Sequence, residues 1–131
     1  VEEAKNILGM KEEKDIKNLL VAMREKGPNV IVITDGPKGA YAYDGYEGYF
    51  MPPFPDQNPP YERTGAGDAF ASTFTSAIAL GRSLFDALLW APINSMSVVQ
   101  KVGAQKGLLT QEEILVYLSK APESYRPEKI M

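Results

Sequence analysis

The sequence predicts an α/β fold, with helices packed on a mostly parallel sheet and a β-hairpin beside it. Three patterns support this prediction. Apolar residues recur at helical spacing over residues 2–26. Residues 30–33 are all β-branched and are bounded by turn residues, which is typical of a strand buried on both faces. Asp44-Gly45 lies between two aromatic-rich segments and predicts a hairpin with a two-residue turn.

Two helices are expected before the first strand. The first is short and carries Ala4, Ile7 and Leu8, and the second carries an apolar stripe that includes Leu19 and Leu20. Gly27 and Pro28 end the second helix, because both residue types interrupt helical hydrogen bonding. A helix that leads directly into a buried strand is the unit from which α/β sheets are built.

The middle of the chain is expected to contain an extended loop and then a buried helix. Residues 52–60 hold five of the ten prolines, which excludes a helix in that segment. Residues 69–80 are small or apolar at nearly every position, as in a helix surrounded by protein, and Gly81 is a natural end for it.

Two further helices are expected towards the C-terminus. Ser83 and Asp86 can cap a helix that runs towards residue 99, and Pro92 should kink or divide that helix. Thr110 and Glu113 form a capping box at the start of the last helix.

Composition excludes several classes of function. The 131 residues include 14 lysines and arginines against 17 aspartates and glutamates, and no basic run indicates a nucleic-acid or anionic-membrane partner. The chain has neither cysteine nor histidine, which excludes disulfides, the usual zinc ligand sets and Ser–His or Cys–His catalysis. No apolar run could cross a bilayer, and we expect a cytoplasmic protein.

One segment, Thr64-Gly65-Ala66-Gly67-Asp68, stands where a loop meets a helix. Backbone N–H groups lack partners at a helix start and the helix dipole is positive there, so such a junction binds anions. Two glycines let the backbone approach a phosphoryl group closely, and Asp68 could take a proton from a hydroxyl aimed at that group. Taken alone, the same residues also fit a plain helix start.

The wider pattern resembles a known family. The run from Arg63 to Phe70, R-T-G-A-G-D-A-F, resembles the D-T-x-G-A-G-D-x-F signature of the ribokinase-like (PfkB) carbohydrate kinase family. Residues 32–39 resemble the strand and nucleotide loop of that family, and residues 103–104 resemble the pair that closes its adenine-side helix. The resemblance covers essentially the whole chain in order.

The resemblance implies a role for each residue of the Gly-Ala-Gly-Asp segment. Gly65, Ala66 and Gly67 would form the anion hole for the transferred phosphoryl group, and Asp68 would activate the acceptor hydroxyl. A plain N-terminal cap is the alternative interpretation of these four residues.

The resemblance also implies a nucleotide site. Thr34, Gly36 and Gly39 would line the ATP site, although ordinary strand-end turn residues need no ligand. Gly103 would lie on the adenine side, and so would Asn94, although the family's common asparagine falls about two positions earlier, where this chain has a proline.

Metal ions are implied less directly. Glu3 matches the second half of the family's Asn-x-x-Glu motif and could contact Mg²⁺ or phosphate, whereas a solvated helix glutamate explains it nearly as well. Glu62 stands where the family commonly has Asp, and together with Gly103 it could hold a monovalent cation such as K⁺. The longer side chain of Glu62 puts that cation site in question.

The resemblance implies a partial ribokinase-like sandwich. Family members are about twice this length, so residues 1–131 are interpreted as a single C-terminal nucleotide-binding and catalytic portion, without the N-terminal half and lid that hold the acceptor. We expect that portion to be inactive alone, and we expect its exposed sheet edge to bind the missing half of the protein or a second copy in a homodimer.

The expected reaction is transfer of the ATP γ-phosphate to a hydroxyl of a small sugar or sugar-like acceptor, with Mg²⁺ neutralising phosphate charge. Three alternatives stay open. One is a nucleoside kinase or a pyridoxal- or hydroxymethylpyrimidine-type vitamin kinase on the same fold. Another is a catalytically silent nucleotide- or sugar-binding regulator, and the third is a purely structural domain.

Overall fold

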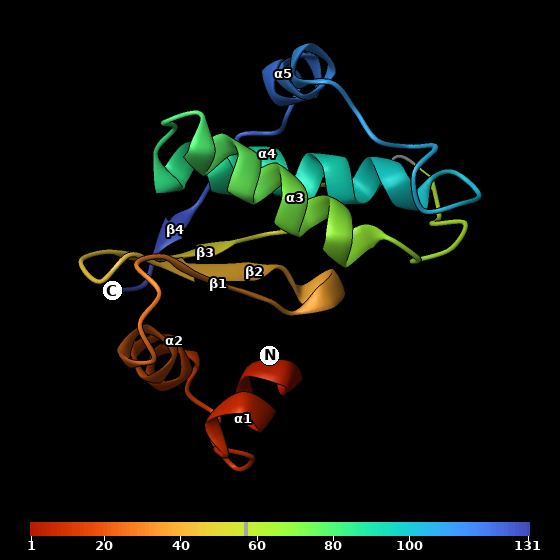
Figure 1. The fold of residues 1–131 in the computed structure, drawn as a ribbon. Coiled ribbons are helices and arrows are strands. Elements are labelled where there is room, and N and C mark those ends of the chain that lie inside the picture. The colour runs from red at the N-terminus through yellow and green to blue at the C-terminus, as the bar shows by residue number, and fades with distance from the viewer. Residues whose placement is uncertain (57) are drawn as a thin grey trace. The chain divides into compact units, whose positions relative to one another are not determined.

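The computed structural model describes residues 1–56 and 58–131, and these form two compact units. Unit 1 comprises Val1–Met51 and Pro127–Met131, and unit 2 comprises Pro52–Arg126 (Figure 1). One residue of the extended loop expected at 52–60, residue 57, lies outside the described part. Within that part, no helix combines the length and apolar character needed to cross a membrane.

Unit 1 contains two helices, a short 3₁₀ turn and four strands. Their bounds are α1 Glu2–Leu8, α2 Ile16–Glu25, β1 Ile31–Thr34, η1 Gly36–Lys38, β2 Ala40–Tyr43, β3 Gly48–Met51 and β4 Glu128–Lys129. The start of α2 is capped by Asp15, whose side chain accepts a hydrogen bond from the Lys17 N–H at 2.9 Å. Leu19 and Leu20 of α2 are fully buried and pack in one cluster with Ile31 and Ile33 of β1.

The sheet of unit 1 has the order β1-β2-β3-β4, and every neighbouring pair is antiparallel. The α/β class is confirmed, but the prediction of mostly parallel pairing is wrong for the strands described. The connections explain the difference: only residues 35–39 join β1 to β2, whereas a parallel pair needs a crossover of about a dozen residues or more. Burial also alternates along β1, so this strand is not buried on both faces.

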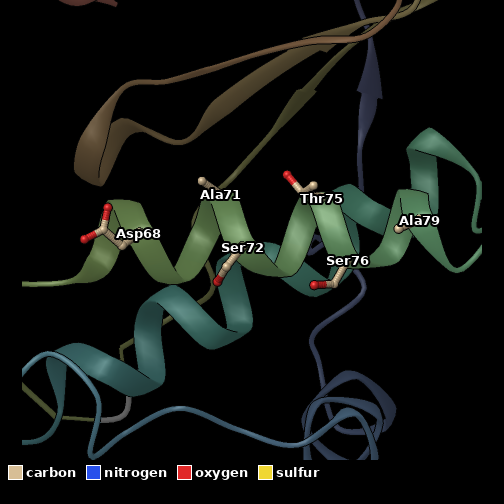
Figure 2. A pocket seen from close by; sticks show the side chains of 6 residues that line it. All are labelled: Asp68, Ala71, Ser72, Thr75, Ser76 and Ala79. Atoms are coloured by element: carbon tan, nitrogen blue, oxygen red, sulfur yellow. The ribbon is translucent and has the colours of Figure 1, made fainter.

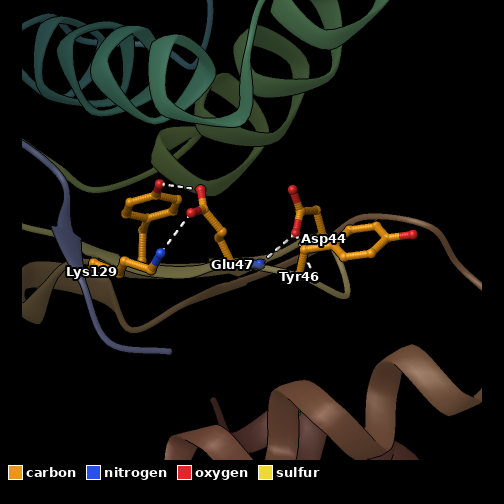
Figure 3. A network of polar contacts seen from close by, with 5 residues as sticks. Asp44, Tyr46, Glu47 and Lys129 are labelled. Carbon is orange, nitrogen blue, oxygen red and sulfur yellow. Dashed lines mark hydrogen bonds and ion pairs between the residues drawn. The ribbon is translucent and has the colours of Figure 1, made fainter.

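The predicted hairpin is confirmed as β2 and β3, although its loop has four residues, 44–47, rather than two. The Asp44 side chain determines this loop, because its Oδ1 accepts hydrogen bonds at 2.8 Å from the N–H groups of Tyr46 and Glu47 (Figure 3). Tyr41 and Phe50 face each other across the strands with ring centroids 5.3 Å apart. Aromatic cross-strand packing therefore stabilises the hairpin.

The last strand of unit 1 comes from the C-terminal end of the chain. Lys129 of β4 pairs with Tyr49 of β3, and the Lys129 Nζ donates a 2.6 Å hydrogen bond to a carboxylate oxygen of Glu47 (Figure 3). The Tyr49 hydroxyl donates to the other oxygen of Glu47 at 2.6 Å. These bonds, led by the one from Lys129, lower the pKa of Glu47. A polar network on one side of the sheet therefore ties β4 to the hairpin.

Unit 2 contains three helices: α3 Ala66–Ala79, α4 Leu84–Val99 and α5 Gln111–Ser119. Helices α3 and α4 lie side by side (Figure 1), and Ala69 of α3 packs in one buried cluster with Val98 and Val99 of α4. Pro92 lies inside α4, which continues as one helix and is not divided there. The expected caps are confirmed at Ser83 and at the Thr110–Glu113 box.

A second cluster in unit 2 is aromatic. Phe54 packs edge-on against Tyr117 and Tyr125, with ring centroids 6.0 and 4.8 Å away. The buried hydroxyl of Tyr125 donates a 2.7 Å hydrogen bond to the Leu89 carbonyl, and burial raises the pKa of Tyr125 far above its ordinary value. Trp90 is also buried, as expected for a core residue, and the Arg82 guanidinium lies 5.3 Å from its ring centroid.

Candidate active site

The turn before α3 has a geometry that requires glycine. Gly65 is the N-cap residue and has a φ of 84°, which lies in the left-handed region. A Cβ placed on Gly65 would lie 2.9 Å from both the Cβ and the carbonyl oxygen of Ala104. The Gly65 carbonyl accepts the Ala69 N–H at 2.9 Å and so begins the helix. Both the backbone conformation and the close packing therefore select glycine at this position.

The next backbone amides are available to a ligand. The Ala66 N–H bonds the Arg63 carbonyl at a long 3.3 Å, and the N–H groups of Gly67 and Asp68 have no hydrogen-bond partner among residues 1–56 and 58–131. Gly67 is exposed, and no atom lies within 4 Å of where its Cβ would be. Unpaired amides at the positive end of a 14-residue helix, next to an exposed residue with no side chain, suit an anion.

Asp68 stands in the first turn of α3, one residue beyond Gly67. Its exposed side chain lines one end of an open hollow of about 540 Å³ that runs along one face of the helix (Figure 2). The rest of this hollow is lined by small residues: Ala71, Ser72, Thr75, Ser76 and Ala79. A carboxylate therefore lies beside unpaired amides and at the edge of an open space, where it can accept a proton from a bound hydroxyl.

Two side chains from elsewhere in unit 2 support the turn. The Ser95 hydroxyl of α4 donates a 3.0 Å hydrogen bond to the Ala66 carbonyl. A carboxylate oxygen of Glu62 accepts the Gly103 N–H at 2.9 Å, which joins the segment before the turn to the segment after α4. Sequence reasoning missed Ser95, which carries no local motif, and it placed Ala104 in a motif without revealing the contact with Gly65.

Asn94, expected at the nucleotide site, lies within α4. Its side chain is buried, with the amide nitrogen donating to the Thr73 hydroxyl at 2.8 Å and the amide oxygen accepting the Leu109 N–H at 2.9 Å. Both ends of the amide therefore have partners inside unit 2, and a place for Asn94 in the nucleotide site stays a prediction. From α4, the Asn94 side chain therefore bonds both α3 and the loop before α5.

The expected nucleotide-loop residues Thr34, Gly36 and Gly39 lie in unit 1, around the 3₁₀ turn η1. Thr34 and Gly36 are exposed, whereas Gly39 is buried. A Cβ on Gly39 would collide with the Met51 carbonyl, and the φ of Gly39 is 114°. Packing against β3 therefore suffices to explain Gly39, while the exposed pair remains open to a ligand.

The residues suggested for metal binding do not gather. Glu3 is an exposed residue of α1, and within the described part of the chain no three acidic or other ligating side chains form a group that could hold a metal ion. Glu62 already accepts a backbone hydrogen bond, and Gly103 donates it. That bond involves neither the second carboxylate oxygen of Glu62 nor the Gly103 carbonyl, so a cation site at these residues stays a prediction.

This chain is similar to curated kinases. A 5-dehydro-2-deoxygluconokinase from Clostridium perfringens is 30% identical over 132 residues, which cover 91% of this chain and 38% of that protein. A ribokinase from Bacillus subtilis is 35% identical over 92 residues, which cover 70% of this chain and 31% of that protein. The chain therefore spans about a third of the length of these relatives.

A solved structure has the same fold. The fructokinase from Vibrio cholerae O395, determined in its fructose-, ADP- and calcium-bound form, superposes with a TM-score of 0.73 at 24% identity, covering 89% of this chain and 38% of that one. The model of the pfkB family carbohydrate kinases matches residues 1–111. With the sequence motif, the fold and the family match in agreement, this chain belongs to the pfkB family of carbohydrate kinases.

Proposed function

We propose that this chain supplies the phosphate-binding turn and the catalytic base of an ATP-dependent kinase that phosphorylates a hydroxyl of a small sugar or sugar-like acceptor. In this proposal residues 1–131 are a C-terminal portion of the enzyme, and the rest of the protein holds the acceptor. The fructose and ADP named in the V. cholerae structure and the sugar kinases among the relatives support this class of donor and acceptor.

The observation that carries the proposal is the start of α3. The unpaired N–H groups of Gly67 and Asp68 lie where a helix dipole favours negative charge. Negative charge spreads over the phosphoryl oxygens as the group is transferred, and fixed N–H donors that face it stabilise the transition state. The Asp68 carboxylate then removes the proton from the attacking hydroxyl, so a more nucleophilic oxygen meets the phosphorus.

The bound nucleotide would bring its own charge-neutralising cation when it carries Mg²⁺. In this chain Thr34 and Gly36 remain the proposed nucleotide contacts, because both are exposed next to the 3₁₀ turn after β1. Gly103 contributes indirectly, since its N–H is bonded to Glu62. We propose no acceptor contact within residues 1–131, and consequently expect this portion to be inactive without the rest of the protein.

The decisive experiment replaces Asp68 with asparagine in the full-length protein. Asp68→Asn should lower kcat about 10²-fold or more, because the general base is lost while shape and volume are kept. ATP should still raise the melting temperature of the variant, since the amides and the nucleotide loop are intact.

Asp86 offers a matched control for this experiment. It occupies the third position of α4, as Asp68 does in α3, so both carboxylates interact equally with a helix dipole. Asp86→Asn should therefore lose a similar, small amount of stability and keep full kcat. Near-wild-type turnover by Asp68→Asn would refute the assignment of the base.

An acceptor screen separates the remaining alternatives. Small sugars and sugar acids should be phosphorylated in preference to nucleosides and to pyridoxal- or hydroxymethylpyrimidine-type compounds. A protein that binds ATP but phosphorylates none of them would instead be a silent regulator. A protein whose melting temperature ATP does not change would be a structural domain.

A further inference from the structure

The loop between α4 and α5, residues 101–110, folds back onto unit 2 and is held at several points. We name this segment the return loop. Near its start, the Gly103 N–H donates to the Glu62 carboxylate at 2.9 Å. Near its end, the Leu109 N–H donates to the Asn94 side chain at 2.9 Å. Between them Gly107 is buried, and a Cβ there would lie 2.6 Å from the Val98 Cα, so the loop backbone packs directly on α4.

Ala104 of the return loop packs against the phosphate-binding turn, residues 65–67. Ala104 lies so close to Gly65 that a Cβ on Gly65 would be 2.9 Å from the Ala104 carbonyl oxygen. Gly65 immediately precedes the helix whose first amides face the open site. A displacement of the loop would therefore remove the support that holds Gly65 in its left-handed conformation, and the following amides would move with it.

Asn94 is the link that fixes this loop to the two packed helices. Its side chain is only 5% exposed and extends from α4, donating to Thr73 of α3 and accepting from Leu109. An amide side chain suits this place because it offers a donor and an acceptor at once. Removing it would leave the Thr73 hydroxyl and the Leu109 N–H without these partners, and the loop without its second anchor.

We propose that Asn94 is a positioning residue: it holds the return loop, and through Ala104 it holds the Gly65–Gly67 turn in the geometry that receives the transferred phosphoryl group. This inference rests on the proposed function. It assigns Asn94 an effect on the transition state, because the amides it aligns bind the charge that develops there, whereas uniform binding of ATP depends mainly on other residues.

The test compares three variants in the full-length protein. Asn94→Ala removes both hydrogen bonds and should lower kcat about 10-fold while KM for ATP changes less than about 2-fold. Thr73→Val removes only the bond to α3 and keeps a similar volume, so it should lose stability but keep kcat within about 2-fold. Asn94→Asp retains the acceptor for Leu109, and the Thr73 hydroxyl can rotate to donate to it, so kcat should return to within about 3-fold of wild type.

A second readout needs no turnover. Amide hydrogen exchange at Gly103, which Asn94 does not touch, should become faster in Asn94→Ala and stay unchanged in Thr73→Val. Unchanged exchange at Gly103 together with unchanged kcat in Asn94→Ala would overturn the proposal. Equal losses of kcat in Asn94→Ala and Thr73→Val would also overturn it, because they would indicate general destabilisation.

If Asn94→Ala does not fold, the variant Ala104→Gly tests the proposal instead. Ala104 is exposed, so trimming its methyl group threatens folding little. The change removes the side-chain part of its contact with Gly65 and frees the backbone that supplies the rest, so the support for the turn is loosened. A kcat lowered several-fold would support the proposal that the return loop positions the Gly65–Gly67 turn. A wild-type kcat would overturn it. The proposed function is judged separately: full turnover by Asp68→Asn would refute that function while the exchange at Gly103 still tests how Asn94 positions the loop.

Discussion

Replacing Gly67 with alanine would separate a binding role from a folding role at the start of α3. The φ of Gly67 lies outside the left-handed region, and no atom is within 4 Å of the position its Cβ would take. The folded chain therefore has room for a methyl group. Alanine also restricts the unfolded chain more than glycine does, which favours the helix.

Gly67→Ala should raise the stability of the protein and lower its turnover. Stability should rise by up to about 1 kcal/mol, the difference between alanine and glycine in a helix, and by less if the first turn frays. Turnover should fall, because a phosphoryl oxygen must come within about 2.9 Å of an amide nitrogen to bond it, and the new methyl group occupies that approach. Loss of one such donor lowers kcat on the order of 10²-fold, or about 3 kcal/mol.

Gly65→Ala is the matched comparison. The left-handed φ of 84° costs about 1–2 kcal/mol for a residue with a side chain. Contact with Ala104 at 2.9 Å adds an overpacking cost of about 1–3 kcal/mol. The two contributions together predict a destabilisation of about 2–5 kcal/mol, against a gain for Gly67→Ala.

Denaturant unfolding and steady-state kinetics of the full-length protein would measure both quantities. Three results are expected together: Gly67→Ala more stable than wild type, Gly67→Ala slower in turnover, and Gly65→Ala less stable. Full turnover by a stabilised Gly67→Ala would refute the close approach of phosphate to this turn. A large loss of stability in Gly67→Ala would show that the space in front of the amide is already filled in the folded protein.

Three further predictions concern folding. Gly39→Ala should destabilise unit 1 by about 2 kcal/mol or more in denaturant unfolding, because its φ is 114° and its Cβ would collide with a β3 carbonyl. Tyr125→Phe should cost about 1 kcal/mol by the same assay, since the hydrogen bond from the buried Tyr125 to the Leu89 carbonyl is lost. The bond from Lys129 lowers the pKa of Glu47, so its stabilising effect is present above the ordinary carboxyl pKa of about 4.3 and is lost as the pH falls through the lower folded value. Protection of the β3–β4 amides, measured as the exchange rate relative to that of the unprotected amide at the same pH, should therefore fall as the pH drops through the lowered pKa of Glu47 in the wild type and show no such step in Glu47→Gln.

Local patterns predicted local structure well. The caps at Ser83 and Thr110 were predicted because a side-chain oxygen and an N–H three residues later interact within one turn. The hairpin was predicted from the Asp44-Gly45 pair, and its loop is longer than expected because the Asp44 side chain accepts from two N–H groups. The helix start at Gly65 was also predicted from neighbouring residues, whereas its role as a candidate site was predicted from the resemblance to the family.

Contacts between distant residues could not be predicted in this way. The bond from Lys129 to Glu47 joins residues 82 positions apart, and nothing in either segment indicates the other. The pairing of β4 with β3 depends on such contacts. Asn94 shows the consequence most clearly: by sequence it was a nucleotide contact, and in the fold both ends of its amide are used by unit 2 itself.

The sequence by itself therefore determined the helices, their caps, the hairpin and the junction at which an acidic residue follows two glycines. These features depend on hydrogen bonds and backbone preferences within a few residues, which a linear pattern records. Only the tertiary structure decided the strand order, the contact between Ala104 and Gly65, and the two hydrogen bonds of the Asn94 side chain. Those features arise from packing and from pairing of polar groups between segments that are far apart in the chain, where burial rather than local sequence selects the partner.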